Sequence, residues 1–287
     1  MKAVLKREIS SYFTTMIGYI FIALILLTCG IFTYLECFKL GSPQFQYVVN
    51  YVQLVFFLAI PVLTMRSIAD ERYQKTDQLL FSLPMKISKI VIGKYLAMVT
   101  ILAVPTLIMC FVPPIISLYG KISFFTAYSS LFGFFILGCA LLAIGLFISS
   151  VSGSQVIAAI ISFFVMLFIM MMSMISSLIP TSAEASLAAI AVIILIFAVV
   201  LYVMTKSYPI AIITGGALGS GLAVFFILSK SSFEGLFGKI VSALSLYDRC
   251  YTFYDGIFDL KTVIYYFGII AIFLFLTTQA VEKRRWS

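Results

Sequence analysis

The stretch Arg66-Ser-Ile-Ala-Asp-Glu-Arg-Tyr-Gln-Lys-Thr-Asp-Gln-Leu-Leu-Phe-Ser-Leu-Pro84 places charges of both signs between two long apolar runs. The polar segment continues to Lys94, and Leu79, Leu80 and Leu83 keep an apolar stripe within it. Charged side chains are costly to bury in an apolar medium, so this segment is expected in water. Its mixture of charges and leucines predicts that it docks onto another surface. The apolar runs on either side predict a membrane protein.

Composition indicates that the solvent for most of the chain is a lipid bilayer. Of the 287 residues, 63% are hydrophobic and 10% are charged, and the mean hydropathy is +1.16. A water-soluble domain needs far more polar surface than this. Only helices and closed barrels satisfy the backbone in lipid, and continuous apolar runs favour helices. The predicted fold class is therefore an all-α polytopic membrane protein.

Eight apolar runs are long enough to be predicted as transmembrane helices, which need roughly 20 residues each. The first run lacks the small-residue cleavage site of a signal peptide and is interpreted as an anchor. Glycines such as Gly215 and Gly221 leave two interpretations of 209–229 open, a full span or a re-entrant helix. The predicted spans are 17–36, 50–68, 95–119, 127–149, 156–179, 186–205, 209–229 and 262–281.

The positions of lysine and arginine predict the orientation of these spans. With a cytoplasmic N-terminus, thirteen of the 19 basic residues lie inside and six lie outside. Because cytoplasmic loops are enriched in basic residues, both termini are predicted inside, with an extracytoplasmic loop at 230–261. Removing one span would place either Lys2–Arg7 or Lys283–Arg285 outside. The basic residues flank spans and do not form one surface, so no nucleic-acid partner is expected.

Residues 1–16 are predicted to form an amphipathic helix at the cytoplasmic surface of the membrane. Its basic residues fall away from an apolar stripe on the helical wheel. Two interpretations stay open, a membrane anchor alone or an anchor that also contacts a cytoplasmic partner. The stripe consists of Leu5, Ile9, Tyr12, Phe13 and Met16.

Residues that commonly carry catalysis are missing from the sequence. There is no histidine, which is the commonest general base and metal ligand. The carboxylates fall in loops or at predicted span ends, so no proton relay within the membrane is predicted. No G-x-x-x-x-G-K-[ST] phosphate loop occurs, and the run Gly215–Gly221 lies in an apolar span, where small residues favour helix packing. No catalytic residue, metal ligand or bound cofactor is therefore assigned to this chain.

Methionines and cysteines leave several interpretations open. Met166, Met170 and Met174 share one face of a predicted span, which suits packing, lipid contact or varied apolar ligands. Thioethers also bind Cu(I), which is a further interpretation. Cys37 and Cys250 both lie outside in the predicted topology, so a disulfide between them stays open.

Motifs in four parts of the chain form a family pattern. They are Met65-Arg-Ser-Ile-Ala-Asp-Glu-Arg72, Thr76-Asp-Gln-Leu-Leu80, Leu83-Pro84 and Gly93-Lys94-Tyr95, with Leu5-Lys-Arg-Glu8, Ala143-Ile-Gly-Leu-Phe-Ile-Ser-Ser150 and Glu282-Lys-Arg-Arg-Trp286. Together they resemble type-2 ABC transporter permeases, particularly the gliding-motility-type branch. The resemblance covers roughly residues 1–180 and 243–286. The chain departs from the six-span pattern of that family by two inserted hydrophobic runs within 186–229.

The resemblance implies a permease that dimerises with a copy or a close relative. A separate ATP-binding-cassette ATPase, which would hold ATP and Mg, would drive it. Residues 66–94 would form a coupling segment seated in that ATPase, with polar contacts, an apolar anchor and a proline that ends the helix. The residues themselves leave a second interpretation open, a loop that is merely solvated by its charges. The predicted coupling residues are Arg66, Asp70, Glu71, Arg72, Leu79, Leu80, Leu83 and Pro84.

The same resemblance implies a substrate route between the two permease halves, lined by the second and fifth spans. Such a lining suits an amphipathic or apolar cargo, because bare ions would find few partners there. The predicted function is the permease subunit of an ABC exporter in the cytoplasmic membrane of a prokaryote. An ATP-independent carrier or structural membrane subunit, and less so a lipid-modifying membrane enzyme, remain alternatives. The candidate route residues are Gln53, Thr64, Phe163, Met166, Met170 and Met174.

Overall fold

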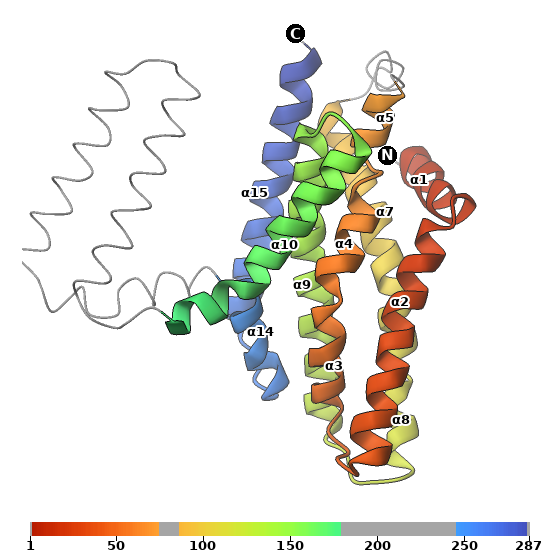
Figure 1. The fold of residues 1–287 in the computed structure, drawn as a ribbon, viewed down its shortest axis with the longest axis vertical. Coiled ribbons are helices and arrows are strands. Elements are labelled where there is room, and N and C mark those ends of the chain that lie inside the picture. The colour runs from red at the N-terminus through yellow and green to blue at the C-terminus, as the bar shows by residue number, and fades with distance from the viewer. Residues whose placement is uncertain (1, 75–85, 179–244, 286–287) are drawn as a thin grey trace, which may run out of the picture. The chain divides into compact units, whose positions relative to one another are not determined.

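The computed structural model describes residues 2–74, 86–178 and 245–285, and every regular element in these ranges is a helix. The all-α prediction is confirmed for this part of the chain. The chain divides into two compact units, Met1–Met170 with Leu246–Ser287, and Met171–Ser245 (Figure 1). The helices are α1 (Lys2–Thr14), α2 (Ile17–Phe32), the π-helix η1 (Thr33–Lys39), α3 (Phe45–Leu54), α4 (Phe56–Thr64), α5 (Ala69–Tyr73), α7 (Ile87–Met109), α8 (Val112–Ser117), α9 (Phe124–Val151), α10 (Gln155–Leu178), α14 (Leu246–Tyr254) and α15 (Leu260–Arg285).

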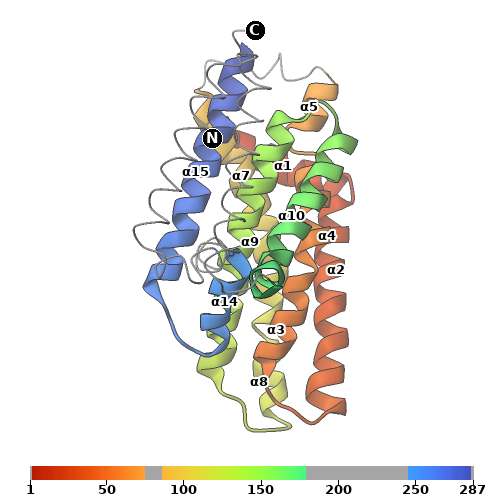
Figure 2. The ribbon, with the colours of Figure 1, turned by 60° about the vertical axis from the view of Figure 1, so that its left-hand side comes forward.

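Helix α9 forms the centre of the first unit. Its residues are apolar or small on all sides, as expected for a helix that lies in an interior, and most of them are buried. It packs against α3, α4, α7, α14 and α15, and Figure 2 shows α7, α9 and α15 side by side. Glycines allow this close approach, because a Cβ on Gly138 would lie 2.7 Å from a methyl carbon of Leu102.

Within the described residues, five helices are long and apolar enough to cross a membrane, or six if one bent pair counts as a single span. They coincide with the predicted spans that fall in the described residues. The other two predicted spans, 186–205 and 209–229, lie outside these residues, so the count of eight stays a prediction. The five unbent candidates are Ile17–Lys39, Ile87–Ser117, Phe124–Val151, Gln155–Met172 and Leu260–Lys283.

The second span is bent, whereas a single helix over 50–68 was expected. The stretches Phe45–Leu54 and Phe56–Tyr73 meet at an angle of 50°. The break lies at Val55, whose N–H donates to the carbonyl oxygen of Val52 three residues earlier, whereas Pro61 lies further on within α4. The third span also differs from expectation, since α7 begins at Ile87 and not at residue 95.

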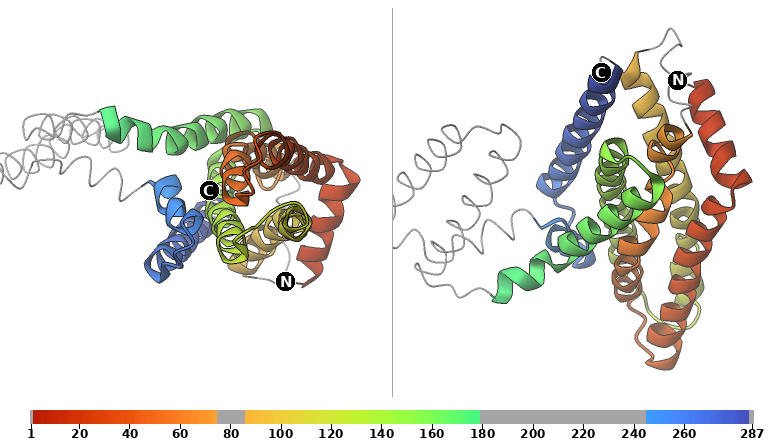
Figure 3. Two further views of the ribbon diagram at one scale, coloured as in Figure 1. Left: turned by 90° about the horizontal axis from the view of Figure 1, so that it is seen from below. Right: turned by 45° about the horizontal axis from the view of Figure 1, so that its top comes forward.

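Helix α1 crosses the end of the bundle. The left panel of Figure 3 looks along α7 and α9, and in this view α1 is seen along its length. Its buried residues are Val4, Glu8 and Tyr12, and it packs on α7. The predicted apolar stripe is therefore only partly buried, and Met16 is 69% exposed. Met16 adopts a left-handed conformation, φ 61°, at the turn between α1 and α2. The helix docks on the protein through one polar and two apolar residues, which the amphipathic pattern alone did not predict.

The predicted loop 230–261 contains helix α14, which packs on α9, α15 and α3. Cys250 of α14 is fully buried, and a Cβ on Gly133 of α9 would lie 3.1 Å from its sulfur. All five cysteines are free. The disulfide between Cys37 and Cys250 that the sequence left open is therefore not formed.

Candidate functional site

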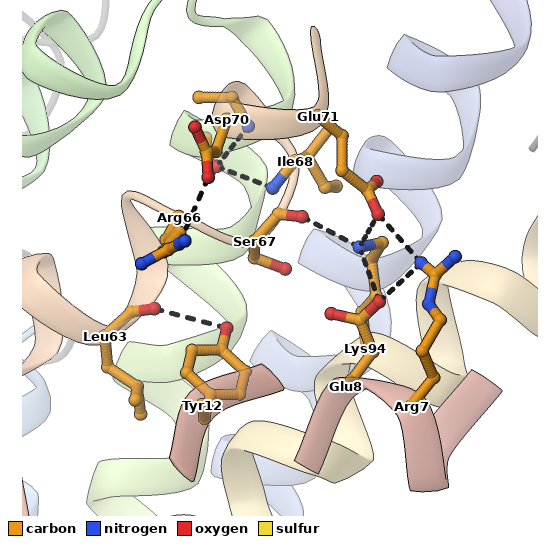
Figure 4. A network of polar contacts seen from close by, with 12 residues as sticks. Arg7, Glu8, Tyr12, Leu63, Arg66, Ser67, Ile68, Asp70, Glu71 and Lys94 are labelled. Carbon is orange, nitrogen blue, oxygen red and sulfur yellow. Dashed lines mark hydrogen bonds and ion pairs between the residues drawn. The ribbon is translucent and has the colours of Figure 1, made fainter. Parts of the chain in front are cut away.

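Polar contacts concentrate at one end of the first unit, where α1, α5 and the first turns of α7 meet the last turns of α9 (Figure 4). We call this end the charged end. Figure 1 shows the ends of α1 and α15 that carry the chain termini on this side of the bundle. The charged end includes the start of the polar segment from which the coupling role was predicted.

Four charged side chains, Arg7, Glu8, Glu71 and Lys94, form a compact group that we call the ion-pair cluster (Figure 4). Lys94 Nζ lies 3.1 Å from Glu8 Oε1 and 2.9 Å from Glu71 Oε1. Arg7 Nη2 lies 2.8 Å from Glu8 Oε1 and 2.9 Å from Glu71 Oε1. Lys94 also donates a hydrogen bond of 2.8 Å to the carbonyl oxygen of Ser67. Two cations and two carboxylates leave the cluster without net charge.

The cluster joins three segments that are far apart in the sequence. Glu8 lies on the buried face of α1 together with Val4 and Tyr12, at a spacing of four residues. Lys94 is two turns into α7 and is 2% exposed, in line with the buried Ile90 and Met98. Glu71 comes from α5, just after the second span. The cluster therefore attaches both α1 and the polar segment to the start of the third span.

The ion pairs of Lys94 and of Arg7 differ in how much they stabilise the protein. Breaking a buried ion pair by removing one partner typically costs about 3–5 kcal/mol, because a charge is left uncompensated in the interior. This applies to Lys94 and its two carboxylates. The side chain of Arg7 is 54% exposed, and exposed pairs contribute about 0–1 kcal/mol. The hydrogen bond with Glu8 raises the pKa of Arg7 further above its ordinary value, so it stays charged. Lys94 is thus the centre of the cluster and Arg7 its outer member.

A further contact ties α1 to the end of the second span. The hydroxyl of Tyr12 donates a hydrogen bond of 3.3 Å to the carbonyl oxygen of Leu63. Tyr12 is buried, one turn from Glu8 on the same face of α1. The helix therefore contacts the chain both before and after the start of the polar segment.

The predicted coupling residues within the described part of the segment all have partners inside the chain. Arg66 Nε lies 3.1 Å from Asp70 Oδ2, and Glu71 pairs with Lys94. Arg72 Nη1 donates a hydrogen bond of 2.9 Å to the carbonyl oxygen of Ser152. These residues hold the start of the segment on the helical bundle. The remaining predicted coupling residues, Leu79, Leu80, Leu83 and Pro84, lie outside the described residues.

The candidate route residues are mostly packed inside the protein. Gln53 accepts a hydrogen bond from the hydroxyl of Tyr254, and Thr64 donates one of 3.0 Å to the carbonyl oxygen of Ile60. Both side chains are buried.

Phe163 of α10 contacts Phe57 of α4 with ring centroids 5.7 Å apart, so the second and fifth spans are adjacent, as the route requires. Met166 is buried, Met170 is half-buried and Met174, which belongs to the second unit, is 57% exposed.

Sequence reasoning missed Glu8, Lys94 and Tyr12 as members of the site. Two signals pointed to them. Glu8 and Tyr12 are four residues apart on one face of α1, and Lys94 recurs at helical spacing with apolar residues of α7. Among the described residues, no group of three or more His, Cys, Asp or Glu side chains is arranged to hold a metal ion.

The chain matches the model of a known protein family. The model described as ABC-2 family transporter protein matches residues 9–173, which is more than half of the chain. The matched region runs from α1 to α10 and includes Tyr12, Glu71 and Lys94. No curated protein matches the sequence significantly.

Proposed function

Because the chain belongs to the ABC-2 family of transporter membrane proteins, we propose that it is the permease subunit of an ABC exporter of the gliding-motility-type branch. Its cargo would be an amphipathic or apolar molecule, carried across the cytoplasmic membrane of a prokaryote. Hydrolysis of ATP with Mg would take place on a separate ATP-binding-cassette subunit. The observation that carries this proposal is the attachment of the polar segment to the membrane helices through Lys94.

If ATP is hydrolysed on a separate subunit, as proposed, the chain needs a firm connection to that subunit. The connection must resist bending, or the motion imposed on it would be lost before it reaches the spans. Lys94 provides such a connection, because it pairs with Glu71 of the polar segment and Glu8 of α1 from a buried position on α7. The pair with Glu71 and the hydrogen bond from Lys94 to the carbonyl oxygen of Ser67 would both have to break before the segment could move independently of the third span.

The surface that meets the ATPase is assigned to the part of the segment beyond Arg72. Arg66, Asp70, Glu71 and Arg72 already have partners within the chain. We assign to them the role of holding the segment in place. Leu79, Leu80 and Leu83 would supply the apolar anchor in the ATPase, and Pro84 would end the docking helix.

The proposed topology has eight spans with both termini in the cytoplasm. The excess of basic residues in the loops on that side supports this orientation. The terminal ends of α1 and α15 on one side of the first unit support an even number of spans (Figure 1). A cysteine-accessibility map that placed Ser207 or Ser287 outside would contradict the proposal.

The substrate route would lie between this chain and a second permease chain, either a copy or a relative. The contact between Phe57 and Phe163 supports the part of that assignment that brings the second and fifth spans together. Because Gln53 and Thr64 are buried against neighbouring helices, they would enter the route only in another conformation.

Association is tested by co-expressing the chain with the ATP-binding-cassette ATPase proposed as its partner. Leu80→Asp removes an apolar anchor, which typically costs about 2 kcal/mol or more in an interface and corresponds to roughly 30-fold weaker binding. We therefore expect the parent chain, but not this variant, to co-purify with the ATPase. Ile257→Asp is the matched control, since it makes the same kind of change at an exposed position before α15.

Coupling is tested with Glu71→Ala in liposomes that contain the assembled complex. This variant loosens the attachment of the segment without altering its proposed docking surface. We expect association to persist while the amount of substrate moved per ATP falls. If the parent chain neither binds the ATPase nor requires ATP for transport, the alternative of an ATP-independent carrier is correct instead.

A further inference from the structure

Helix α5 has an unusual start. Its N-cap residue is Ile68, whose side chain has no polar atom, and no side-chain cap is present there. The cap comes instead from another helix, because Ser149 Oγ of α9 accepts the backbone N–H of Ile68 at 3.2 Å and that of Ala69 at 3.1 Å. The first N–H groups of a helix have no partner within it, so this single hydroxyl satisfies two of them. Ser149 and Ala69 are both buried.

The end of α9 is capped in return by α5. Arg72 Nη1 donates a hydrogen bond of 2.9 Å to the carbonyl oxygen of Ser152 and one of 3.5 Å to that of Val151. Ser152 is the C-cap residue of α9, where the last carbonyl groups carry partial negative charge. A guanidinium at this position is both a hydrogen-bond donor and a favourable charge. Each helix thus supplies a side chain that completes the other.

These contacts are part of a regular row along the two elements. One turn before Ser149, a Cβ on Gly145 would lie 2.7 Å from Thr64 Oγ1, so α4 rests on the bare backbone of α9. On the side of the second span the row runs through Thr64, Ile68 and Arg72, four residues apart. On α9 it runs through residues 145, 149 and 152. A row with this spacing holds two elements in one register.

We propose that Ser149 and Arg72 are positioning residues that join the polar segment to α9, so that α5 and α9 move as one body during the transport cycle. This inference rests on the proposed function and adds that α9 is the helix to which the polar segment transmits its motion. The ion-pair cluster attaches the segment to α1 and α7, whereas this joint attaches it to the central helix. Since α9 also packs against α14 and α15, a displacement of α5 reaches both of them through α9.

The test compares single hydroxyl deletions in the complete complex, reconstituted with its ATPase. Ser149→Ala leaves the N–H groups of Ile68 and Ala69 without a partner, and for a buried group such as that of Ala69 this typically costs about 1–3 kcal/mol. We expect the amount of substrate moved per ATP to fall about fivefold or more, while association with the ATPase is unchanged. Ser149→Thr keeps the acceptor oxygen and is expected to restore the ratio.

Ser150→Ala is the matched control. Ser150 is the neighbouring buried serine of α9, but its hydroxyl donates to the carbonyl oxygen of Phe147 within the same helix. Removing it is expected to leave the ratio of transport to ATP hydrolysis unchanged. Arg72→Ala should behave like Ser149→Ala. Arg72→Lys keeps a cationic donor, so it should move more substrate per ATP than Arg72→Ala.

A reversible cross-link distinguishes two cases. Either α5 and α9 move as one body during the transport cycle, or they must slide past each other. In a chain whose own five cysteines are replaced, Ala69→Cys with Ser149→Cys should be uncoupled when reduced. Oxidation should form the disulfide and restore coupling. If the disulfide does not form, or if it forms and blocks transport, the proposed joint is wrong. A parent complex that couples normally, with every variant also normal, would overturn this inference and leave the proposed function intact.

Discussion

The charged end and the contact made by α14 hold their helices together in different ways. At the charged end, ion pairs and helix caps fix α1, α5, α7 and α9. At the α14 contact, the hydroxyl of Tyr254 donates to Gln53, and Phe253 and Cys250 pack against the bare backbone of Gly133.

The difference indicates how each region responds to the loss of one group. Buried charges depend on one another, so removing one leaves the others uncompensated. Neutral hydrogen bonds and packing contacts contribute about 1 kcal/mol each and fail separately. The charged end should therefore act as a unit that transmits motion, whereas the α14 contact should loosen in small steps. Three substitutions test this contrast, and a fourth tests the turn between α1 and α2.

The largest effect is expected at Lys94. Lys94→Met leaves Glu8 and Glu71 close together without their shared ammonium, and the free energy of unfolding should fall by about 3–5 kcal/mol. Lys94→Arg keeps the charge, so its free energy of unfolding should fall by less. Chemical unfolding in mixed micelles measures both. A loss below about 1 kcal/mol for Lys94→Met would show that the cluster does not act as a unit.

A smaller effect is expected at Gly133. A Cβ there would lie 2.9 Å from Phe253 Cβ and 3.1 Å from Cys250 Sγ, so Gly133→Ala forces α14 away from α9. Overpacking of this kind costs about 1–3 kcal/mol. Gly268→Ala in α15 is the control, because nothing lies within 4 Å of the Cβ it would add. Equal stability of the two variants would contradict the described contact.

Tyr254→Phe should have a still smaller effect. It removes the hydrogen bond to Gln53 but keeps the ring, so the loss of stability is expected to be about 1 kcal/mol. Tyr251→Phe, at the more exposed neighbouring ring, should change stability little. The same unfolding measurement compares the two. A loss as large as that of Lys94→Met would remove the contrast between the regions.

The smallest effect is expected at the turn between α1 and α2. Met16 has a φ of 61°, a conformation that costs a residue with a side chain about 1–2 kcal/mol and glycine almost nothing. Met16→Gly also adds freedom to the unfolded chain, so a net gain of about 0.5 kcal/mol is expected. Met16→Ala retains the strain and serves as control. A destabilised glycine variant would show that the turn is held by the methionine side chain.

The sequence predicted the elements that depend on local composition. Run length predicted the spans found in the described residues, and the charges around Asp70 and Glu71 located the charged end. It did not predict the bend at Val55, because this residue lies in a continuous apolar run with no glycine or proline beside it. It also placed Lys94 in water. A lysine two turns inside an apolar helix is tolerated only because Glu8 and Glu71 arrive from segments 86 and 23 residues away, a pairing that only the tertiary fold creates.

The capping of α5 also depends on the tertiary fold and could not be predicted from the sequence. Ser149 is one of several serines near the end of α9, and no local pattern distinguishes it from Ser150. Its role follows from the register between α4, α5 and α9. Likewise, the pattern of α1 predicted an amphipathic helix but not the face by which it docks, because Glu8 becomes a buried residue only when Lys94 is opposite.

The most direct measurement is photo-cross-linking from the polar segment to the ATPase in the assembled complex. A photoreactive amino acid is placed in turn at Leu79, Leu80 and Leu83, and a further variant carries it at Ile257 as control. The account predicts an adduct with the ATP-binding-cassette subunit from position 80 and none from position 257. Absence of an adduct from positions 79, 80 and 83 in every nucleotide state would contradict the claim that this segment couples the chain to an ATPase.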